Sequence, residues 1–434
     1  MVTAPGLLIA AARSGSGKTT LALGLMRALT RRGLRVSAVK CGPDYIDPAF
    51  HAAATGRDSL NLDSWAMSAP TIGALAELAS AGADLIVAEG AMGLFDGAPG
   101  GASGVGASAD IAAMLGWPVL LVQDVSGQAQ TAAAVIRGLA SHDSRLTIAG
   151  VIANRIGSAR HRRLVADGVA ALGLPLFGAL PRNEAVGLPE RHLGLVQAGE
   201  TAQLHERLNA LADFAEAHID LDAVAQAAAV APSLPAPNFS IKPPAQRIAI
   251  ARDEAFSFFY PHLARGWRAA GAELFPFSPL ADEAPPQHCE LCWLPGGYPE
   301  LHAGRLAQAS TFLAGLRDFA RTRPVHGECG GFMVLGRTLV DATGDAHPMA
   351  GLLDLETSFA TRKLHLGYRI ARLPADHCLG PKGKIIRGHE FHYASVVRQS
   401  GEPFVMARDA YSDSEMREGL RQEHVSGSFF HVIG

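Results

Sequence analysis

The stretch Leu7-Leu8-Ile9-Ala10-Ala11-Ala12-Arg13-Ser14-Gly15-Ser16-Gly17-Lys18-Thr19-Thr20 is followed directly by the mostly apolar residues 21–29. The short apolar run predicts a buried strand, the Ser/Gly cluster a tight loop, and the remainder a helix. A phosphate-binding loop needs this order, because its glycines let backbone N–H groups converge on phosphate oxygens at a helix N-terminus. We therefore expect the chain to begin with a nucleoside triphosphate site.

The pattern G-x-x-x-x-G-K-[ST] is met at Gly17, Lys18 and Thr19, with Ala12 in place of its first glycine. Lys18 is expected to reach the β- and γ-phosphates of ATP, and the Thr19 hydroxyl to ligate Mg²⁺. A plain Gly-rich turn with a surface lysine is the alternative, and the strand before and helix after the loop argue against it. The loop residues assigned to ATP are Ser14, Gly15, Ser16, Gly17, Lys18, Thr19 and Thr20.

Composition limits the class of protein. The chain has 434 residues, 48% of them hydrophobic and 18% charged, which predicts two or three domains. A net charge of -3 gives no field that favours nucleic acid or an acidic membrane. Five cysteines, an odd number, argue for a reducing compartment rather than a disulfide framework. With no signal peptide visible, we expect a cytoplasmic protein that binds neither nucleic acid nor membrane.

The predicted strand at residues 34–40 runs into the loop Cys41-Gly42-Pro43-Asp44-Tyr45-Ile46-Asp47-Pro48. Loops after strands in open α/β sheets lie at the carboxyl edge, where ligands bind. Asp44 or Asp47 therefore faces the Mg²⁺ ion or the substrate, although acids beside proline also cap turns. We take Asp44 as the metal candidate, and Tyr45 with Asp47 as substrate-loop candidates.

The apolar strand predicted at residues 84–90 becomes acidic at Glu89. A carboxylate that ends a buried strand beside a phosphate loop is placed to position Mg²⁺; a solvated strand-end acid is the alternative. The Gly-rich residues 91–108, which include Asp96, are expected to form a mobile substrate loop.

Further strands are predicted at residues 118–123, 147–154 and 174–180, alternating with helical segments. This alternation predicts a parallel, doubly wound α/β sheet. Asn154 ends one of these strands, where an amide could read a base edge. Residues 231–246 are rich in proline and predict a linker between an ATP-binding domain (1–230) and a second domain (247–434).

The α/β rhythm restarts after the linker, which predicts a second doubly wound domain. A strand at residues 290–294 delivers Pro295-Gly296-Gly297-Tyr298-Pro299-Glu300. A glycine pair after a strand leaves backbone N–H groups free to point at a ligand. Cys289 and Cys292 form C-x-x-C, but no second pair lies at zinc spacing, which favours buried thiols.

The segment Gly327-Glu328-Cys329-Gly330-Gly331 contains G-x-C-x-G between a short strand and a helix, the thiol counterpart of the nucleophile elbow. The helix N-terminus is expected to lower the pKa of the Cys329 thiol. The Gly330 N–H, with one from Gly296 or Gly297, could form an oxyanion hole. A structural buried cysteine is the alternative.

A thiol nucleophile needs a base, usually histidine. Periodicity alone does not choose between His389, which precedes Glu390, and His431, which ends a small and apolar strand near the C-terminus. The full set of candidates after the elbow is His365, His389, His392, His424 and His431.

These motifs, in this order across nearly the whole chain, resemble the cobyrinic acid a,c-diamide synthase family. The matching segments are residues 15–20, Gly42 to Asp47, Glu89-Gly90 with Asp96-Gly97, Pro295 to Glu300, Gly327 to Gly331, and Gly388-His389-Glu390-Phe391-His392-Tyr393. The resemblance implies a dethiobiotin-synthetase-like ATP domain and a class I glutamine amidotransferase domain. It implies amidation of the a and c acetate side chains of cobyrinic or hydrogenobyrinic acid, a corrinoid polycarboxylate.

By resemblance, Cys329 is the nucleophile, His431 activates it and Asn154 contacts adenine, while His389 and Glu390 match a motif whose role stays open. Most class I amidotransferases follow this histidine with Pro-Glu, whereas His431 precedes Val432-Ile433. The implied reaction releases ammonia from glutamine through a thioester. ATP activates the substrate carboxylate as an acyl phosphate, which ammonia then attacks.

Two alternatives remain open from the sequence. One keeps the chemistry and changes the acceptor, as in cobyric acid synthase or a nickel-sirohydrochlorin diamide synthase. The other is a P-loop switch ATPase of the partitioning type with a non-catalytic second domain; such proteins carry a second lysine near position 13 and need no Cys329. The order of amidation, the presence of cobalt and the oligomeric state stay open, with a homodimer as the candidate assembly.

Overall fold

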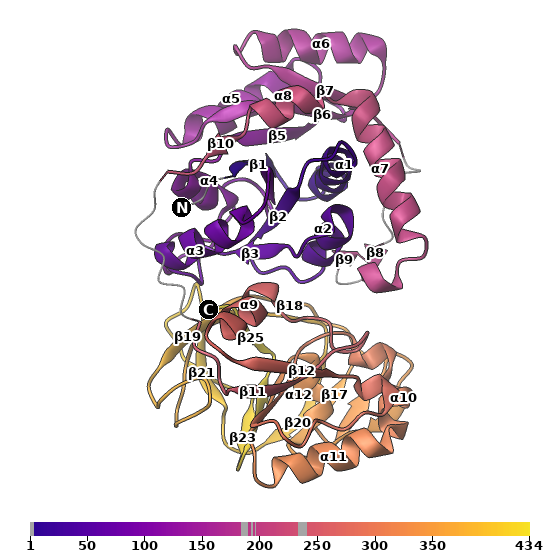
Figure 1. Cartoon of the computed structure of the whole chain (residues 1–434), viewed down its shortest axis with the longest axis vertical. Coiled ribbons are helices and arrows are strands. Elements are labelled where there is room, and N and C mark those ends of the chain that lie inside the picture. The colour runs from indigo at the N-terminus through magenta and orange to yellow at the C-terminus, as the bar shows by residue number, and fades with distance from the viewer. Residues whose placement is uncertain (1–3, 184–189, 192–193, 196, 233–240) are drawn as a thin grey trace. The chain divides into compact units, whose positions relative to one another are not determined.

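The computed structural model describes residues 4–183, 190–191, 194–195, 197–232 and 241–434. It divides the chain into two compact units, Met1–Phe239 and Ser240–Gly434 (Figure 1). Within the described ranges, the strands of each unit pair only with strands of the same unit. Residues 233–240 of the predicted linker lie outside the described part of the chain.

A mainly parallel sheet organises the first unit, in the strand order β3-β2-β4-β1-β5-β6-β7, with β10 added antiparallel to β1. The predicted parallel α/β sheet is thereby confirmed. Its central strand β1 is buried along both faces because helices cover the sheet on either side, which explains its unbroken apolar run. The strands are β1 (Pro5–Ala11), β2 (Val36–Cys41), β3 (Leu60–Leu62), β4 (Leu85–Glu89), β5 (Val119–Asp124), β6 (Ile148–Ile156), β7 (Leu176–Pro181) and β10 (Ala229–Val230), with a separate pair β8 (Glu190–Arg191) and β9 (Gly194–Leu195).

The helix that follows the phosphate loop, α1, packs along α7 (Figure 1). A Cβ on Gly24 would lie 2.8 Å from the Leu211 carbonyl oxygen, so glycine is what allows the two helices this close approach. Arg27 Nε donates to Asn209 Oδ1 at 2.9 Å across the same contact. The helices of this unit are α1 (Lys18–Arg31), α2 (Asp47–Thr55), α3 (Ala69–Ser80), α4 (Ser108–Leu115), α5 (Thr131–His142), α6 (Ala159–Ala170), α7 (Leu204–His218), α8 (Leu221–Gln226) and the 3₁₀ turn η1 (Ala198–Glu200).

The second unit contains a six-stranded sheet in the order β12-β11-β13-β14-β24-β23, parallel from β12 to β24. Its apolar residues form one buried cluster with the helices that cover it. The elements are β11 (Arg247–Ala251), α9 (Pro261–Ala269), β12 (Glu273–Phe277), η2 (Pro279–Ala281), β13 (Leu291–Leu294), η3 (Pro299–Leu301), α10 (Ala303–Gln308), α11 (Ser310–Ala320), β14 (Val325–Glu328), α12 (Gly330–Leu335), β23 (Leu420–Gln422) and β24 (Val425–Ser428).

Largely antiparallel sheets follow α12, and the sequence reasoning did not anticipate them. One has the order β16-β15-β17-β20 and the other β22-β21-β18-β19-β25. The second sheet matters for function because it pairs β19, the strand of the His389 motif, with β25 at the C-terminus. These strands are β15 (Thr338–Val340), β16 (Ala346–Pro348), β17 (Asp354–Ser358), β18 (His365–Arg372), β19 (Ile385–His392), β20 (Ser395–Ser400), β21 (Val405–Asp409), β22 (Met416–Glu418) and β25 (Phe430–Val432).

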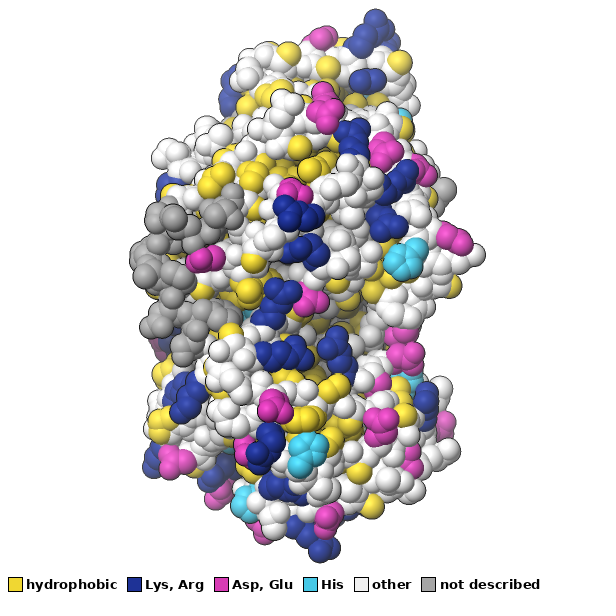
Figure 2. Space-filling view, viewed as in Figure 1, with side chains coloured by type: hydrophobic (Ala, Val, Ile, Leu, Met, Phe, Trp, Pro, Cys, Tyr) yellow, Lys and Arg dark blue, Asp and Glu magenta, His cyan; other side chains and the backbone are white. Residues whose placement is uncertain are grey.

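The surface carries charges of both signs. Figure 2 shows Lys and Arg side chains interspersed with Asp and Glu on the visible face. Among the described residues, no helix combines the length and the apolar character needed to cross a membrane.

Candidate functional site

The phosphate loop has the backbone its sequence requires. Gly15 (φ 72°) and Gly17 (φ 90°) take left-handed conformations, and α1 begins at Lys18 directly after them. The Lys18 ammonium donates to the carbonyls of Met92 (2.5 Å) and Arg13 (3.3 Å), so it lies folded across the loop. Burial, and then the neighbouring Lys40, lower the pKa of Lys18. The loop geometry matches the one predicted for binding phosphate.

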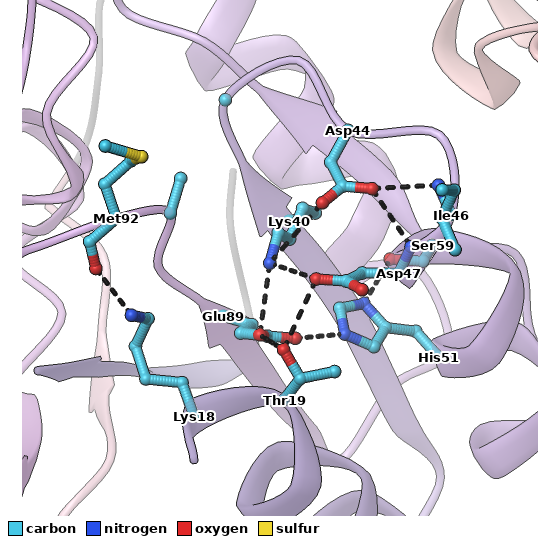
Figure 3. A network of polar contacts seen from close by, with 12 residues as sticks. Lys18, Thr19, Lys40, Asp44, Ile46, Asp47, His51, Ser59, Glu89 and Met92 are labelled. Carbon is cyan, nitrogen blue, oxygen red and sulfur yellow. Dashed lines mark hydrogen bonds and ion pairs between the residues drawn. The ribbon is translucent and has the colours of Figure 1, made fainter. Parts of the chain in front are cut away.

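Thr19 and Glu89 meet at the carboxyl ends of β1 and β4. Thr19 Oγ1 donates to Glu89 Oε1 at 2.6 Å and lies 3.5 Å from Asp47 Oδ2 (Figure 3). Glu89 ends β4, and Thr19 lies in the first turn of α1, which follows the neighbouring parallel strand β1 through the phosphate loop; both residues therefore lie at the carboxyl edge of the sheet. The structure thus brings together the hydroxyl and the carboxylate that the sequence assigned to Mg²⁺.

Lys40, the last lysine before the loop of residues 41–48, was not predicted as a site residue. Its Nζ lies 2.5 Å from Asp47 Oδ2, 3.1 Å from Glu89 Oε1 and 3.9 Å from Asp44 Oδ2. Figure 3 shows the ammonium between these carboxylates. Burial alone would lower the pKa of Lys40, but the carboxylates, Asp47 foremost, raise it well above the ordinary value. A lysine that ends the predicted strand, directly before the Pro- and Asp-containing loop, was the signal that could have identified it.

His51 is a second unpredicted member of this cluster. Its Nε2 lies 2.6 Å from Glu89 Oε2 and its Nδ1 lies 3.1 Å from Ser59 Oγ. Burial would raise the pKa of Glu89, but Lys40 and His51 outweigh burial and lower it. Glu89 is therefore held as a carboxylate, with one oxygen toward Thr19 and the other toward His51.

The two aspartates of the loop have different partners. Asp44 Oδ1 accepts the N–H groups of Ile46 (2.8 Å) and Asp47 (3.0 Å), so this side chain caps a turn. Asp47 instead reaches Thr19 and Lys40, and burial together with Asp44 raises its pKa to about 8. Tyr45, between them, is half-buried. Because Asp44 Oδ1 is committed to the local backbone and only Oδ2 faces Lys40, Asp47 is the better-placed metal candidate, and the assignment of Asp44 to the metal stays a prediction.

The donor set at this edge consists only of oxygen atoms: the Thr19 hydroxyl and the carboxylates of Asp47 and Glu89. Among the described residues no group of three or more His, Cys, Asp or Glu side chains is arranged to enclose a metal ion. Mg²⁺ suits this arrangement, because it binds through one or two carboxylates and keeps water and phosphate oxygens as its other ligands.

The glycines of residues 91–108 serve close packing. A Cβ on Gly101 would lie 1.9 Å from the Gly104 carbonyl oxygen, and one on Gly97 would lie 2.5 Å from that of Val105. Asp96 Oδ2 accepts the Gly93 N–H at 2.7 Å, which closes a turn. The high glycine content therefore has a steric reason and does not by itself indicate a mobile loop.

A cavity of about 410 Å³ lies beside the phosphate loop, bordered by Gly17, Thr20 and Asn154. Asn154 Nδ2 donates to the Ser16 carbonyl at 2.8 Å and its Oδ1 accepts the Arg155 N–H at 2.9 Å. The amide therefore anchors the loop from the cavity wall. Contact between Asn154 and adenine stays a prediction. Both polar atoms of this side chain already have hydrogen-bond partners in the chain.

In the second unit, Cys329 stands on a sharp turn between β14 and α12. Its backbone angles, φ 45° and ψ -101°, are strained for a residue with a side chain. A Cβ on Gly331 would lie 2.0 Å from the Leu294 carbonyl oxygen, and one on Gly327 would lie 2.7 Å from the Gly331 carbonyl carbon. The flanking glycines are thus required by the close approach at the turn. Strain of this kind is typical of nucleophile elbows.

Gly296 brings Cys329 and His431 together. A Cβ on Gly296 would lie 2.5 Å from His431 Cε1, and 3.3 Å from both His431 Nε2 and Cys329 Cβ. Only a residue without a side chain fits between the thiol-bearing carbon and the imidazole. The structure therefore places His431 at the elbow.

The structure shows the other histidine candidates beside residues other than Cys329 or exposed to solvent. His389 is paired with His431 across β19 and β25, with ring centroids 5.4 Å apart. His392 stacks on Phe429 at 3.8 Å and on His365 at 4.7 Å. His424 is exposed in the turn before β24.

Electrostatics at the elbow differ from the prediction. Burial, and then the charge of Glu300, raise the pKa of the Cys329 thiol, so the predicted lowering was wrong. The physical reason is that α12 is a helix of only 6 residues, and its dipole does not offset desolvation of a buried thiolate. Burial also lowers the pKa of His431 to about 3. The resting pair is thus a neutral thiol and a neutral imidazole.

The predicted oxyanion donors adjoin the elbow. Gly297 N would lie 3.0 Å from a Cβ on Gly330, which places these two backbone segments side by side. The Gly330 N–H also acts to lower the pKa of the neighbouring thiol, opposing burial. Gly296 contributes the space described above.

Glu390 is part of an ion-pair network on β19. It pairs with Arg369, and its Oε1 lies 3.7 Å from His392 Nε2. Burial would raise the pKa of Glu390, but His392 and Arg369 lower it to about 2. These contacts give Glu390 a structural role as the carboxylate of an ion-pair network.

Comparison with known proteins finds two family models that match separate parts of the chain. Residues 7–196 match a family model described as the CobQ/CobB/MinD/ParA nucleotide binding domain. Residues 247–434 match one described as the CobB/CobQ-like glutamine amidotransferase domain. A solved structure of the septum site-determining protein MinD with Mg-ADP, from Pyrococcus horikoshii, aligns with a TM-score of 0.31 and 16% identity over 42% of this chain and 84% of that chain. That score is too low to support a conclusion.

Curated relatives match the whole chain. A hydrogenobyrinate a,c-diamide synthase from Mesorhizobium japonicum is 56% identical over 100% of this chain and 99% of its own length. Proteins of the same name from Rhodobacter capsulatus and Agrobacterium fabrum are 58% identical (99% of this chain, 98% of that protein) and 52% identical (100% and 99%). The chain therefore belongs to the hydrogenobyrinate a,c-diamide synthase family.

Proposed function

We propose that this chain uses ATP and glutamine to amidate the a and c acetate carboxylates of hydrogenobyrinic or cobyrinic acid. The observation that carries the proposal is the position of Cys329, on a strained elbow beside His431, in the same chain as a phosphate loop. Full-length relatives named hydrogenobyrinate a,c-diamide synthase support this acceptor over those of cobyric acid synthase or a nickel-sirohydrochlorin enzyme. The elbow also argues against a switch ATPase with a non-catalytic second domain.

The glutamine half-reaction begins with proton transfer from Cys329 Sγ to His431 Nε2. The sulfur then forms a bond to the amide carbon of glutamine, and N–H groups near Gly297 and Gly330 stabilise the oxyanion. His431 returns the proton to the nitrogen, the C–N bond breaks and ammonia leaves. Water hydrolyses the thioester to glutamate and restores the thiol.

In the ATP half-reaction, a substrate carboxylate oxygen attacks the γ-phosphorus and ADP leaves, giving an acyl phosphate. Ammonia then attacks the acyl carbon, the bond between that carbon and the phosphate oxygen breaks, and phosphate leaves. Lys18 balances phosphate charge at the loop, and Lys40 brings a second cation to the same edge. Thr19, Asp47 and Glu89 would hold Mg²⁺, which when bound neutralises charge on the phosphates.

Several finer assignments belong to the same proposal. Residues 1–230 form the amidoligase part, 231–246 the linker and 247–434 the glutamine amidotransferase part. We place the protein in the cytoplasm, because all five cysteines are free.

We propose a homodimer as the assembly, and light scattering in solution measures its mass. Arg155 and Arg182, which line the cavity beside the phosphate loop, are candidates for anionic ligands.

Product analysis tests the acceptor. The chain is incubated with ATP, Mg²⁺ and amide-¹⁵N glutamine, together with either hydrogenobyrinic or cobyrinic acid. We expect mass spectrometry to show two labelled amide nitrogens in the product of the preferred acid, and none without ATP. A chain that hydrolyses glutamine but labels neither acid has another acceptor.

The two loop aspartates give a matched test of the metal assignment. Asp47→Asn removes a carboxylate next to Thr19 and Lys40, so we expect ATP-dependent synthesis to fall at least about tenfold, with a higher Mg²⁺ requirement. Asp44→Asn keeps an oxygen that can accept the Ile46 and Asp47 N–H groups, so we expect a smaller change. Mg²⁺ titrations of both variants provide the measurement. A larger Mg²⁺ shift in Asp44→Asn would contradict the assignment.

A further inference from the structure

His431 is followed by Val432, Ile433 and Gly434, none of which is acidic. A histidine base works through a second group that fixes its tautomer and ring orientation. In the folded chain, a carboxylate reaches His431 from another element. Glu328, the last residue of β14 and the immediate neighbour of Cys329, places its Oε2 3.7 Å from His431 Nδ1.

Glu328 is held in this position by the strand that carries His431. Its Oε1 accepts the backbone N–H of Val432 at 2.9 Å, so one carboxylate oxygen is fixed to β25 and the other is directed toward the imidazole. The side chains of Glu328 and His431 are 3% and 0% exposed, so bulk solvent does not reach this pair.

The two ring nitrogens of His431 face different partners. Nδ1 is the atom near Glu328, whereas Nε2 and Cys329 Cβ both lie 3.3 Å from the point that a Cβ on Gly296 would occupy. The imidazole thus has the Glu328 carboxylate near one nitrogen and the thiol-bearing carbon of Cys329 on the side of the other. This arrangement is that of a catalytic triad, with the acid supplied from the residue before the nucleophile.

We propose that Glu328 is a positioning residue for the glutamine site, accepting a hydrogen bond from His431 Nδ1 so that Nε2 is the atom that takes the Cys329 proton. This inference rests on the roles proposed above for Cys329 and His431. At 3.7 Å the contact is longer than a hydrogen bond, and catalytic contacts of this kind often shorten when substrate binds.

Burial and nearby groups act on the pKa of Glu328 in opposite directions. Burial raises the pKa of Glu328 to about 8, opposed by its bond from Val432 N–H, and an imidazolium on His431 would favour the carboxylate form. On β19, His389, Glu390 and His392 also face His431. Glu390, the competing carboxylate, is already paired with Arg369 and His392.

The first test is Glu328→Gln, which keeps the shape and an oxygen for the Val432 N–H but offers an N–H donor to Nδ1. Because the side-chain N–H introduced by this substitution and the His431 Nδ1–H would then face each other as two donors, the tautomer with the proton on Nε2 is favoured, which cannot accept the thiol proton there. We expect kcat for glutamine hydrolysis to fall at least about tenfold with KM changed less than about twofold. Ammonia-dependent synthesis should be unchanged, and Glu328→Asp should restore part of the loss. Glu390→Gln, the matched control, should cause a smaller loss of kcat.

The outcomes separate this inference from the proposed function. If Cys329→Ala abolishes glutamine hydrolysis and Glu328→Gln leaves kcat intact, the role of Glu328 is overturned and the elbow stands. A larger loss in Glu390→Gln than in Glu328→Gln also overturns it. If Cys329→Ala retains full activity, the proposed glutamine site itself fails.

A measurement on the unmodified chain avoids any folding defect of the variants. With ¹⁵N-labelled histidine, the His431 signals are assigned by their loss in His431→Asn. We expect Nδ1 to carry the proton and Nε2 to be bare at neutral pH. The opposite tautomer would overturn the proposal whatever the variants do.

Discussion

Replacing Cys329 by alanine is expected to lower glutamine-dependent amidation by roughly 10³-fold or more. The reason is that the thioester cannot form without the sulfur, and no water on the enzyme takes over at a comparable rate. Ammonia-dependent amidation should persist, because the ATP site is built from residues of the other unit. Parallel assays with glutamine and with an ammonium salt provide the measurement.

Cys378→Ala is the matched control for this experiment. Cys378 is also a free cysteine of the second unit, half-buried beside His377 and outside the elbow. We expect both activities of this variant to stay near those of the unmodified chain. Loss of both activities in a Cys329→Ala protein that unfolds at the normal temperature would contradict the two-site mechanism.

Replacing Lys18 by alanine is expected to lower ATP-dependent synthesis by roughly 10²–10³-fold, whether glutamine or ammonia supplies the nitrogen. The ammonium balances charge on the transferred phosphoryl group, and the neighbouring Lys40 is already paired with Asp47 and Glu89. Glutamine hydrolysis should continue, because Cys329 and His431 belong to the other unit. Phosphate release and glutamate formation, measured separately, distinguish the two half-reactions.

Lys382→Ala, which removes an exposed lysine of the second unit, controls for loss of charge alone. Its synthesis rate should match that of the unmodified chain. Lys18→Ala also leaves the carbonyls of Met92 and Arg13 without their side-chain donor, at a cost of about 1 kcal/mol each. A thermal unfolding curve shows whether that cost alters the fold. Synthesis at the normal rate in this variant would rule out the phosphate-loop assignment.

Local patterns sufficed to predict most strands of the first sheet and both loops, but not the short strands β3 and β10. An apolar run followed by glycines and a lysine identified β1 and α1, since buried parallel strands are apolar throughout and left-handed turns need glycine. The turn at Cys329 was equally predictable, because glycines on both sides of a strand-end cysteine permit few other conformations. The second domain's antiparallel strands were missed, because an α/β rhythm was extrapolated past α12.

Side-chain partners from distant segments could not be predicted. Lys40 and His51 join Glu89 only because β2, α2 and β4 converge at one sheet edge. The pKa of Cys329 was predicted in the wrong direction, because its burial depends on everything packed around the elbow. Which of Asp44 and Asp47 caps the turn and which reaches Thr19 depends on which backbone N–H groups the turn exposes.

The sequence by itself predicted most strands of the parallel sheet in the first unit, the phosphate loop and the elbow, with Cys329 as its candidate nucleophile. These features follow from short-range sterics and hydrophobic patterning, which neighbouring residues decide. The residue pattern left His389 and His431 open, and the family resemblance favoured His431. Only the tertiary structure set the His431 ring beside Cys329, brought Lys40 and His51 to Glu89, and set Glu328 beside the imidazole. Those choices depend on strand pairing and burial over long sequence separations, and no local pattern records them.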